Sequence, residues 1–159
     1  MKKQKGQVII EFALILPLFI ILLFGIIYCG MLFYDYISLS NIARSAARES
    51  AIVSSFDSTQ RAKIENYYTQ KISGGLLTSL YEAEDVPDTA DPSKSYKITV
   101  SEDDNGTTGD TSDDGVKVVI IMNLNTDTSP LMRMILPPNF KIEYFMRRDE
   151  QANPSGTNS

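Results

Sequence analysis

Hydrophobic residues fill one long segment near the N-terminus and are scattered after it. Residues 12–34 form a run of 23 positions without a charged side chain, FALILPLFIILLFGIIYCGMLFY. At about 1.5 Å per residue, a helix of this length crosses the ~30 Å hydrocarbon layer of a membrane. The run therefore predicts a transmembrane helix. A buried core helix fits less well, because no other segment could surround so much apolar surface.

The charges on either side of the run predict its orientation. The first six residues, MKKQKG, carry three lysines and no acid, and such clusters stay in the cytoplasm. Phe33, Tyr34 and Tyr36 stand where the opposite interface would bear aromatic residues. We expect a single-pass protein of the cytoplasmic membrane, with the N-terminus inside and the C-terminal domain outside.

Two alternatives to a transmembrane helix are a cleaved signal peptide and the N-terminal segment of a lipoprotein. A cleaved signal peptide has an apolar region of about 7–15 residues and an A-x-A-like cleavage site, whereas this run is longer and lacks that site. A lipoprotein would be modified at Cys29, but Tyr28 stands before it, where a small residue is expected. Cys29 is most simply a small hydrophobic residue within the membrane helix.

The helical pattern continues beyond the membrane segment as an amphipathic stalk. Residues 38–56 contain neither Gly nor Pro, and small or apolar residues recur every three to four positions. They are Leu39, Ala43, Ala46, Ser50 and Val53. A helix over residues 7–56 would be about 75 Å long, and Pro17 would bend it. The stripe packs either on the protein's own domain alone, or also on neighbouring helices after assembly.

Shorter periodic segments follow and predict a small domain over residues 57–150. Asp57 and Gln60 resemble a capping box, and Gly74-Gly75 ends the helix that they begin. That helix has an apolar face made by Ile64, Tyr67, Tyr68 and Ile72. Residues 82–94 suggest an acidic loop. Residues 96–100, 116–124 and 140–146 alternate like half-buried strands.

These patterns predict an α+β fold. It has a long N-terminal transmembrane helix that continues into a stalk, then a small globular domain with a short helix and a roughly three-stranded antiparallel sheet. The polar tail 151–159 is expected to be disordered.

Composition then excludes several kinds of chemistry. The chain has no His and a single Cys, which excludes His-dependent triads, imidazole metal sites and an internal disulfide. The net charge is −5, and the sequence has no phosphate-binding glycine loop. We expect no enzyme activity, no cofactor and no nucleic-acid partner.

One acidic loop resembles part of a calcium site. Asp110, Ser112 and Asp114 precede Gly115 as in the first half of an EF-hand loop, but Ile121 stands where the last ligand should be Glu. The pattern favours a solvated hairpin loop, and these three residues are a weak calcium candidate only.

Glu11 is a charge inside the apolar stretch, after Val8-Ile9-Ile10 and before Phe12. A carboxylate in a membrane helix costs about 2.5–3.5 kcal/mol at the centre and less near the ends. Glu11 therefore either reaches the water at the cytoplasmic interface or pairs with another group. Position alone does not choose between these readings.

The surrounding residues favour pairing, because they resemble a known family. A short basic leader ends in Gly6, and Glu11 is the fifth residue after it, as in type IV prepilins. Residues 6–51 resemble the TadE-like family, the pseudopilins or minor pilins of tight-adherence (Flp-type) pilus systems. The matching features are Gly6-Gln7, Glu11-Phe12-Ala13, Leu16-Pro17, Gly25, Gly30, Leu32-Phe33-Tyr34, Asn41-Ile42-Ala43-Arg44 and Ala47-Arg48. Tyr28-Cys29 departs from the polar residue found there in many relatives.

The resemblance implies a processing site and an assembly mechanism. A prepilin peptidase would cleave between Gly6 and Gln7, which removes a leader of residues 1–6. Glu11, followed by Phe12, would then pair with the new amine of a neighbouring subunit and set the register of the helical bundle. The implied partners are this peptidase, other pilins and minor pilins of the same system, and the membrane. After processing, the protein would be pilus-associated.

Two functions from different classes remain. The first is a minor pilin or pseudopilin, cleaved after Gly6 and assembled through its N-terminal helix. The second is a membrane-anchored or pilus-tip module for extracellular binding or adhesion. Cleavage discriminates them, because an assembled subunit needs it and a simple anchored receptor does not.

Overall fold

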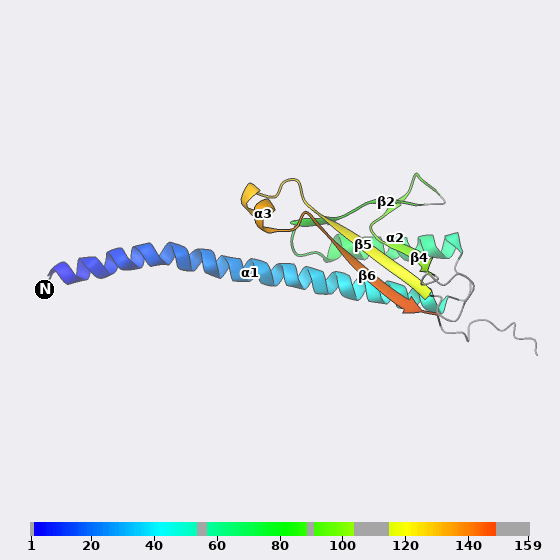
Figure 1. Cartoon of the computed structure of the whole chain (residues 1–159), viewed down its shortest axis with the longest axis horizontal. Coiled ribbons are helices and arrows are strands. Elements are labelled where there is room, and N and C mark those ends of the chain that lie inside the picture. The colour runs from blue at the N-terminus through cyan, green and yellow to red at the C-terminus, as the bar shows by residue number, and fades with distance from the viewer. Residues whose placement is uncertain (1, 54–56, 89–90, 104–114, 149–159) are drawn as a thin grey trace, which may run out of the picture. The chain divides into compact units, whose positions relative to one another are not determined.

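The computed structural model describes residues 2–53, 57–88, 91–103 and 115–148, and the chain forms two compact units, Met1–Tyr34 and Asp35–Ser159. Helix α1, Lys2–Ile52, contributes residues to both (Figure 1). The predicted long N-terminal helix is confirmed. It ends at Ile52 rather than at residue 56, and residues 54–56 lie outside the described part.

The first unit consists of helix α1 up to Tyr34. By length and composition, α1 is the one helix among the described residues that could cross a membrane, over Ile9–Ile52. From Ile9 to Tyr34, every side chain is exposed except the half-buried Met31 and Leu32. Pro17 lies inside the helix.

The second unit contains an antiparallel sheet built around one long strand. Strand β5, Gly115–Leu124, pairs along its whole length with β6, Asn139–Arg147. Its other edge is shared by β4, Thr99–Asp103, and β1, Tyr81–Ala83. Two further short strands, β2 (Val86–Pro87) and β3 (Ser95–Tyr96), pair with each other.

The three predicted strands are confirmed, with corrections. The sheet has four strands, because β1 joins the three predicted ones, and β2 and β3 form a separate two-stranded sheet. Most of β1 and all of β2 come from the segment that the sequence suggested to be loop. The predicted strand over residues 96–100 is interrupted after Tyr96, and the backbone N–H of Lys97 donates to the Thr69 hydroxyl instead. A short helix that the sequence did not predict, α3 (Pro130–Ile135), connects β5 to β6.

Helix α2, Ser58–Gly75, begins and ends where predicted. The Asp57 side chain caps it by accepting from the Gln60 backbone N–H at 2.8 Å. Its buried residues are Ile64, Glu65, Tyr68 and Ile72. The predicted apolar face was therefore wrong at Tyr67, which is exposed. Glu65 is buried on that face instead, where its carboxylate accepts from the Val100 backbone N–H in the sheet.

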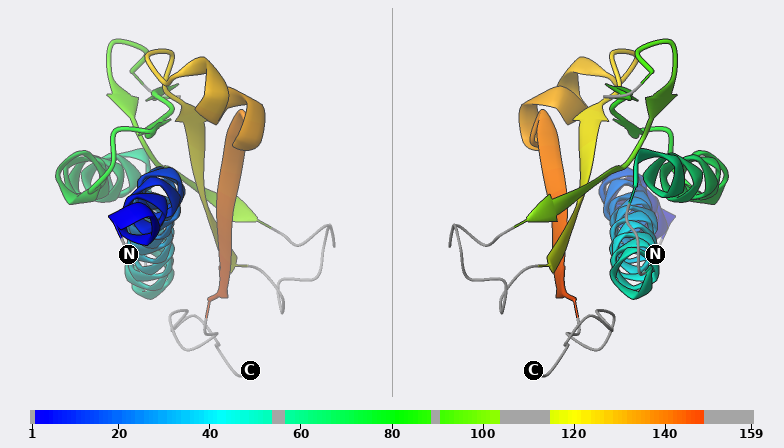
Figure 2. Two further views of the ribbon diagram at one scale, coloured as in Figure 1. Left: turned by 90° about the vertical axis from the view of Figure 1, so that its left-hand side faces the viewer. Right: turned by 90° about the vertical axis from the view of Figure 1, so that its right-hand side faces the viewer.

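The helices cover one face of the sheet in the second unit. Figure 2 shows α1 and α2 together on one side of strands β4, β5 and β6. Four of the five residues of the stripe predicted for the stalk are buried there: Leu39, Ala43, Ala46 and Ser50 are at most 1% exposed. Facing them are Val100, Val116, Val118, Ile120, Met122 and Ile142. The fifth residue of the stripe, Val53, lies beyond the end of α1 and is half-buried. The stripe thus packs on the protein's own domain, and further contact with neighbouring subunits stays a prediction.

Candidate functional site

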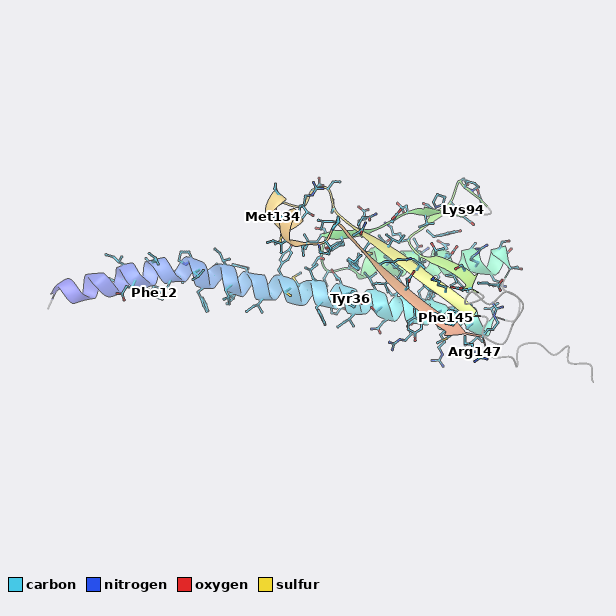
Figure 3. All side chains as sticks on the ribbon, in the orientation of Figure 1. Phe12, Tyr36, Lys94, Met134, Phe145 and Arg147 are labelled. Carbon is cyan, nitrogen blue, oxygen red and sulfur yellow. The ribbon has the colours of Figure 1, made fainter. Side chains whose placement is uncertain are left out.

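Glu11 and Phe12 lie on the exposed surface of the first unit. Phe12 is 63% exposed, and Figure 3 shows it on α1 near the N-terminus. Glu11 is also exposed, within the same apolar stretch of helix. Gly6 and Gln7 belong to the backbone of α1, and their side chains lie outside the described residues. The structure therefore places the four residues on one continuous helix.

The apolar surface around Glu11 extends over every side of the helix. Five successive residues, Phe19 to Leu23, are all between 41% and 70% exposed. Because a helix turns by about 100° per residue, five consecutive positions cover all its faces. No face of this segment is covered within its own unit. Its burial must come from outside the unit, from lipid or from other helices.

The second unit begins with a buried carboxylate that sequence reasoning missed. Asp35 is 6% exposed. One of its oxygens accepts from the backbone N–H of Leu77 at 2.7 Å, and the other accepts from the backbone N–H and the hydroxyl of Thr78 at 3.0 and 2.6 Å. Three donors thus converge on the two oxygens of one buried carboxylate. Asp35 thereby attaches the segment after α2 to α1.

A signal for Asp35 was present in the pattern. It lies four positions before Leu39 and so extends the buried stripe by one helical turn. An acid on an otherwise buried stripe indicates a polar partner in the facing segment. The partner itself, 42 and 43 residues further along the chain, could not be read from the sequence.

Further polar and aromatic contacts hold α1 in the second unit. The Tyr68 hydroxyl of α2 donates to Glu49 at 2.8 Å. Burial, and then the hydrogen bond to Glu49, raise the pKa of Tyr68 above its usual value, so the hydroxyl keeps the proton that it donates. The Arg44 guanidinium lies 5.5 Å from the centre of the Tyr144 ring, and the rings of Tyr36 and Phe140 are 6.2 Å apart.

Glu65 joins α2 to the sheet. Its carboxylate accepts from the backbone N–H of Val100 in β4 at 2.8 Å. Burial raises its pKa to about 7, against the opposing effects of the Val100 hydrogen bond and the Arg61 charge. Together with the bond from Lys97 to Thr69, this contact covers part of the edge of the sheet with α2.

The weak calcium candidate is not tested. Asp110, Ser112 and Asp114 lie outside the described residues. Within the described ranges, no group of three or more Cys, Asp or Glu residues is placed to hold a metal ion.

The comparison with protein families concerns the helix just described. Residues 6–48 match the family model of TadE-like protein. The resemblance read from the sequence is confirmed over this TadE-like segment, which contains Gly6, Gln7, Glu11 and Phe12. It also contains Asp35 and the buried stripe as far as Ala46. No curated protein and no solved structure matches the chain.

The TadE-like segment covers about a quarter of the 159 residues and ends before α2. It therefore includes the whole exposed membrane-length helix and most of the stalk. The sheet, α2 and α3 belong to a part of the second unit that the match does not reach.

Proposed function

We propose that this protein is a minor pilin or pseudopilin of a Tad (Flp) type IV-like pilus. The match to the TadE-like family supports the coarser statement, that the protein is pilin-like and associated with such a pilus. The finer proposal is that a prepilin peptidase cleaves it between Gly6 and Gln7, and that it assembles through its N-terminal helix.

The observation that carries the proposal is the uncovered apolar helix within the TadE-like segment. A membrane anchor needs an apolar surface, and so does a subunit that packs in a helical bundle. The helix from Ile9 to Tyr34 offers that surface on all sides. It can therefore be held by lipid before assembly and by neighbouring helices afterwards.

Glu11 supports the assembly step in particular. A charge on an apolar helix is costly unless it is paired. Cleavage after Gly6 would create an α-amine at Gln7, four residues before Glu11. In a bundle of staggered copies, the amine of one subunit and the Glu11 carboxylate of the next are complementary, which would fix the axial register.

The proposed topology follows from the same helix. The lysines before Gly6 remain on the cytoplasmic side, where the leader is expected, and the second unit lies outside. The partners would be the prepilin peptidase, the membrane and the other pilins of the system.

Processing tests the proposal directly. The mass of the mature protein is measured in membranes with and without the prepilin peptidase, and we expect a peptidase-dependent start at Gln7. Gly6→Leu should leave the precursor uncut, because its side chain obstructs approach to the backbone. Gly25→Leu is the matched control, since a side chain at Gly25 meets nothing within 4 Å in the structure.

A chain that starts at Met1 in both membranes would contradict the proposal. The alternative of a membrane-anchored module for extracellular binding would then take its place.

A further inference from the structure

Exposed apolar residues gather at one end of the second unit. This junction surface consists of Tyr36, Ile37, Leu77, Met134 and Ile135. Their exposed fractions run from 48% for Ile37 to 88% for Met134. Such side chains are normal when scattered singly, whereas a group at one end of a domain indicates a surface that is covered in use.

The contacts within the second unit show that these residues share one end. The Leu77 N–H bonds to Asp35, the first residue of the unit. The Tyr36 ring meets Phe140 at the start of β6, and Phe140 meets Tyr81 at the start of β1. The Tyr81 hydroxyl donates to the carbonyl of Pro137, two residues after α3. Figure 3 shows Met134 on α3 at one end of the β5–β6 pair, and Phe145 and Arg147 toward the other.

The opposite end of the sheet carries charges. The last residues of β4, Glu102 and Asp103, lie there with Arg147, the last residue of β6. Arg148, the next residue along the chain, forms an ion pair with Glu102 at 3.0 Å. The two ends of the second unit thus differ in chemistry. The end that holds Asp35 exposes large apolar side chains, and the opposite end carries charged ones.

The length of the helix indicates what covers the junction surface. The uncharged run ends at Tyr34, and three residues of helix from Tyr34 to Ile37 rise by only ~4.5 Å. The headgroup layer on each side of a bilayer is about 5–7 Å thick. If the run spans the hydrocarbon core, Tyr36, Ile37 and the Leu77 segment bonded to Asp35 lie at headgroup level.

Helix α3 has the composition of a segment that lies in this layer. Its sequence, PLMRMI, combines exposed Met134 and Ile135 with one charge, the exposed Arg133. Apolar side chains reach the acyl boundary from such a position, while a guanidinium binds lipid phosphates.

We propose that the junction surface is a membrane-contacting surface, on which α3 and Leu77 insert into the headgroup layer of the bilayer that holds the N-terminal helix. The proposal rests on the membrane anchoring in the proposed function, and it adds a second attachment that is independent of cleavage. This attachment holds the second unit against the membrane before assembly. Extraction of the subunit into a pilus would have to break it.

The test measures whether lipid or water reaches Met134. The full chain carries Cys29→Ser, so that a cysteine at Met134 is the only one, and it is labelled with an environment-sensitive fluorophore. The protein is reconstituted at low density in vesicles of phosphatidylcholine and phosphatidylglycerol. Its fluorescence is quenched either by nitroxide on the lipid chains near the headgroup or by a water-soluble nickel chelate.

Two control positions make the outcomes distinguishable. Thr59→Cys lies in the first turn of α2, about 24 Å of helix away from Gly75, and should be reached by the aqueous quencher. Ile20→Cys lies in the middle of the uncharged run and should be reached only by lipid nitroxide. A repeat with Ile135→Cys guards against a local effect at Met134.

We expect the ratio of lipid to aqueous quenching to be several-fold higher at Met134 and Ile135 than at Thr59. A ratio equal to that at Thr59, with normal lipid quenching at Ile20, would overturn the inference and leave the anchoring intact. Protection from both quenchers would also overturn it, because a protein surface would then cover α3. Loss of lipid quenching at Ile20 would overturn the anchoring, and the inference with it.

Discussion

Helix α1 presents two kinds of surface along one continuous helix, which differ in side-chain size and in polarity. Up to Tyr34 the helix exposes large residues such as Leu, Ile and Phe on every side. From Asp35 onward, small residues form a buried stripe in which Ala43, Ala46 and Ser50 are 0% exposed. The first part is uncharged from Phe12 to Tyr34, whereas the second part is apolar only along its buried stripe and carries Arg44, Arg48 and Glu49.

Side-chain size and polarity together decide which neighbour each part can take. Small residues let another backbone approach closely, and the second half uses this to pack against its own domain. Large residues instead offer surface to a partner that can adapt its shape, such as lipid or the helices of a bundle. The comparison predicts that equivalent changes in the two halves have different consequences, which the following variants test.

The largest effect is expected from the charge in the first half. Glu11→Ala should insert into the membrane normally, since it removes a cost of about 2.5–3.5 kcal/mol at most, yet should lose incorporation into pili. The readout is the amount of the chain in membranes and in sheared pili. Glu11→Asp keeps the charge and should recover part of the incorporation. Full incorporation of Glu11→Ala would contradict the pairing mechanism.

The same substitution in both halves should separate their roles. Leu39→Ala removes a side chain that is 1% exposed and should lower the free energy of unfolding of the second unit by about 2–5 kcal/mol. Leu22→Ala removes a side chain that is 57% exposed, and it should leave the free energy of unfolding of the second unit unchanged. Tyrosine fluorescence of the full chain in micelles during thermal unfolding measures both. Equal effects of the two substitutions would show that the halves do not differ as described.

Asp35 marks the start of the buried half. Asp35→Asn keeps the size of the side chain but removes the charge that three donors share, so it should cost about 1.5–3 kcal/mol of unfolding free energy. The exposed Asp127→Asn is the matched control and should have no measurable effect. If Asp35→Asn left the free energy of unfolding unchanged in the same assay, the hydrogen bonds of Asp35 would not stabilise the unit.

Glu65 gives the second unit a pH dependence whose sign can be worked out. Its pKa is about 7 in the folded state against an ordinary 4.5, so the folded protein binds this proton more tightly than the unfolded chain. Its contribution to stability is therefore fully present below pH 4.5 and is lost as the pH rises through about 7.

Glu65→Gln mimics the protonated acid at every pH. The variant should have the same free energy of unfolding as the natural protein near pH 4 and a higher one at pH 8. The difference should grow between these pH values. Chemical unfolding at several pH values measures it, and the exposed Glu82→Gln serves as the control. A difference that stayed constant with pH would mean that Glu65 does not titrate in this range.

The smallest effect is expected at Ser50. Its hydroxyl is buried and, within the described part of the chain, has no hydrogen-bond partner. Ser50→Ala should be neutral or should stabilise the second unit by up to about 1 kcal/mol. Ser40, whose hydroxyl donates to the Tyr36 carbonyl, provides the comparison, and Ser40→Ala should gain less. A clear loss of stability for Ser50→Ala would reveal a partner.

Much of the fold could be predicted because it follows from local periodicity. The stripe from Leu39 to Ser50, the cap at Asp57, and the alternation along β5 and β6 are all visible over a few residues. The resemblance around Gly6 and Glu11 is equally local, and the family match confirms it.

The features that sequence reasoning missed depend on distant partners or on very short elements. Strand β1 has three residues and β2 has two, which is too few for an alternating pattern to show. Asp35 and Glu65 are charged residues that would ordinarily be solvated. They are buried because backbone N–H groups of Leu77, Thr78 and Val100 reach them.

The proposed roles of Gly6, Gln7 and Glu11 remain predictions for a different reason. Their partners, a peptidase and neighbouring subunits, are other proteins. The fold of a single chain therefore does not test these roles.

The central claim is that the exposed half of α1 exchanges lipid for other subunits once the chain is processed. Its most direct test is photo-crosslinking from Phe12, replaced by a photoreactive phenylalanine of similar shape, in cells with and without the prepilin peptidase. The account predicts crosslinks to another pilin subunit in the presence of the peptidase and crosslinks to lipid in its absence. Crosslinks to lipid alone in both strains would contradict it.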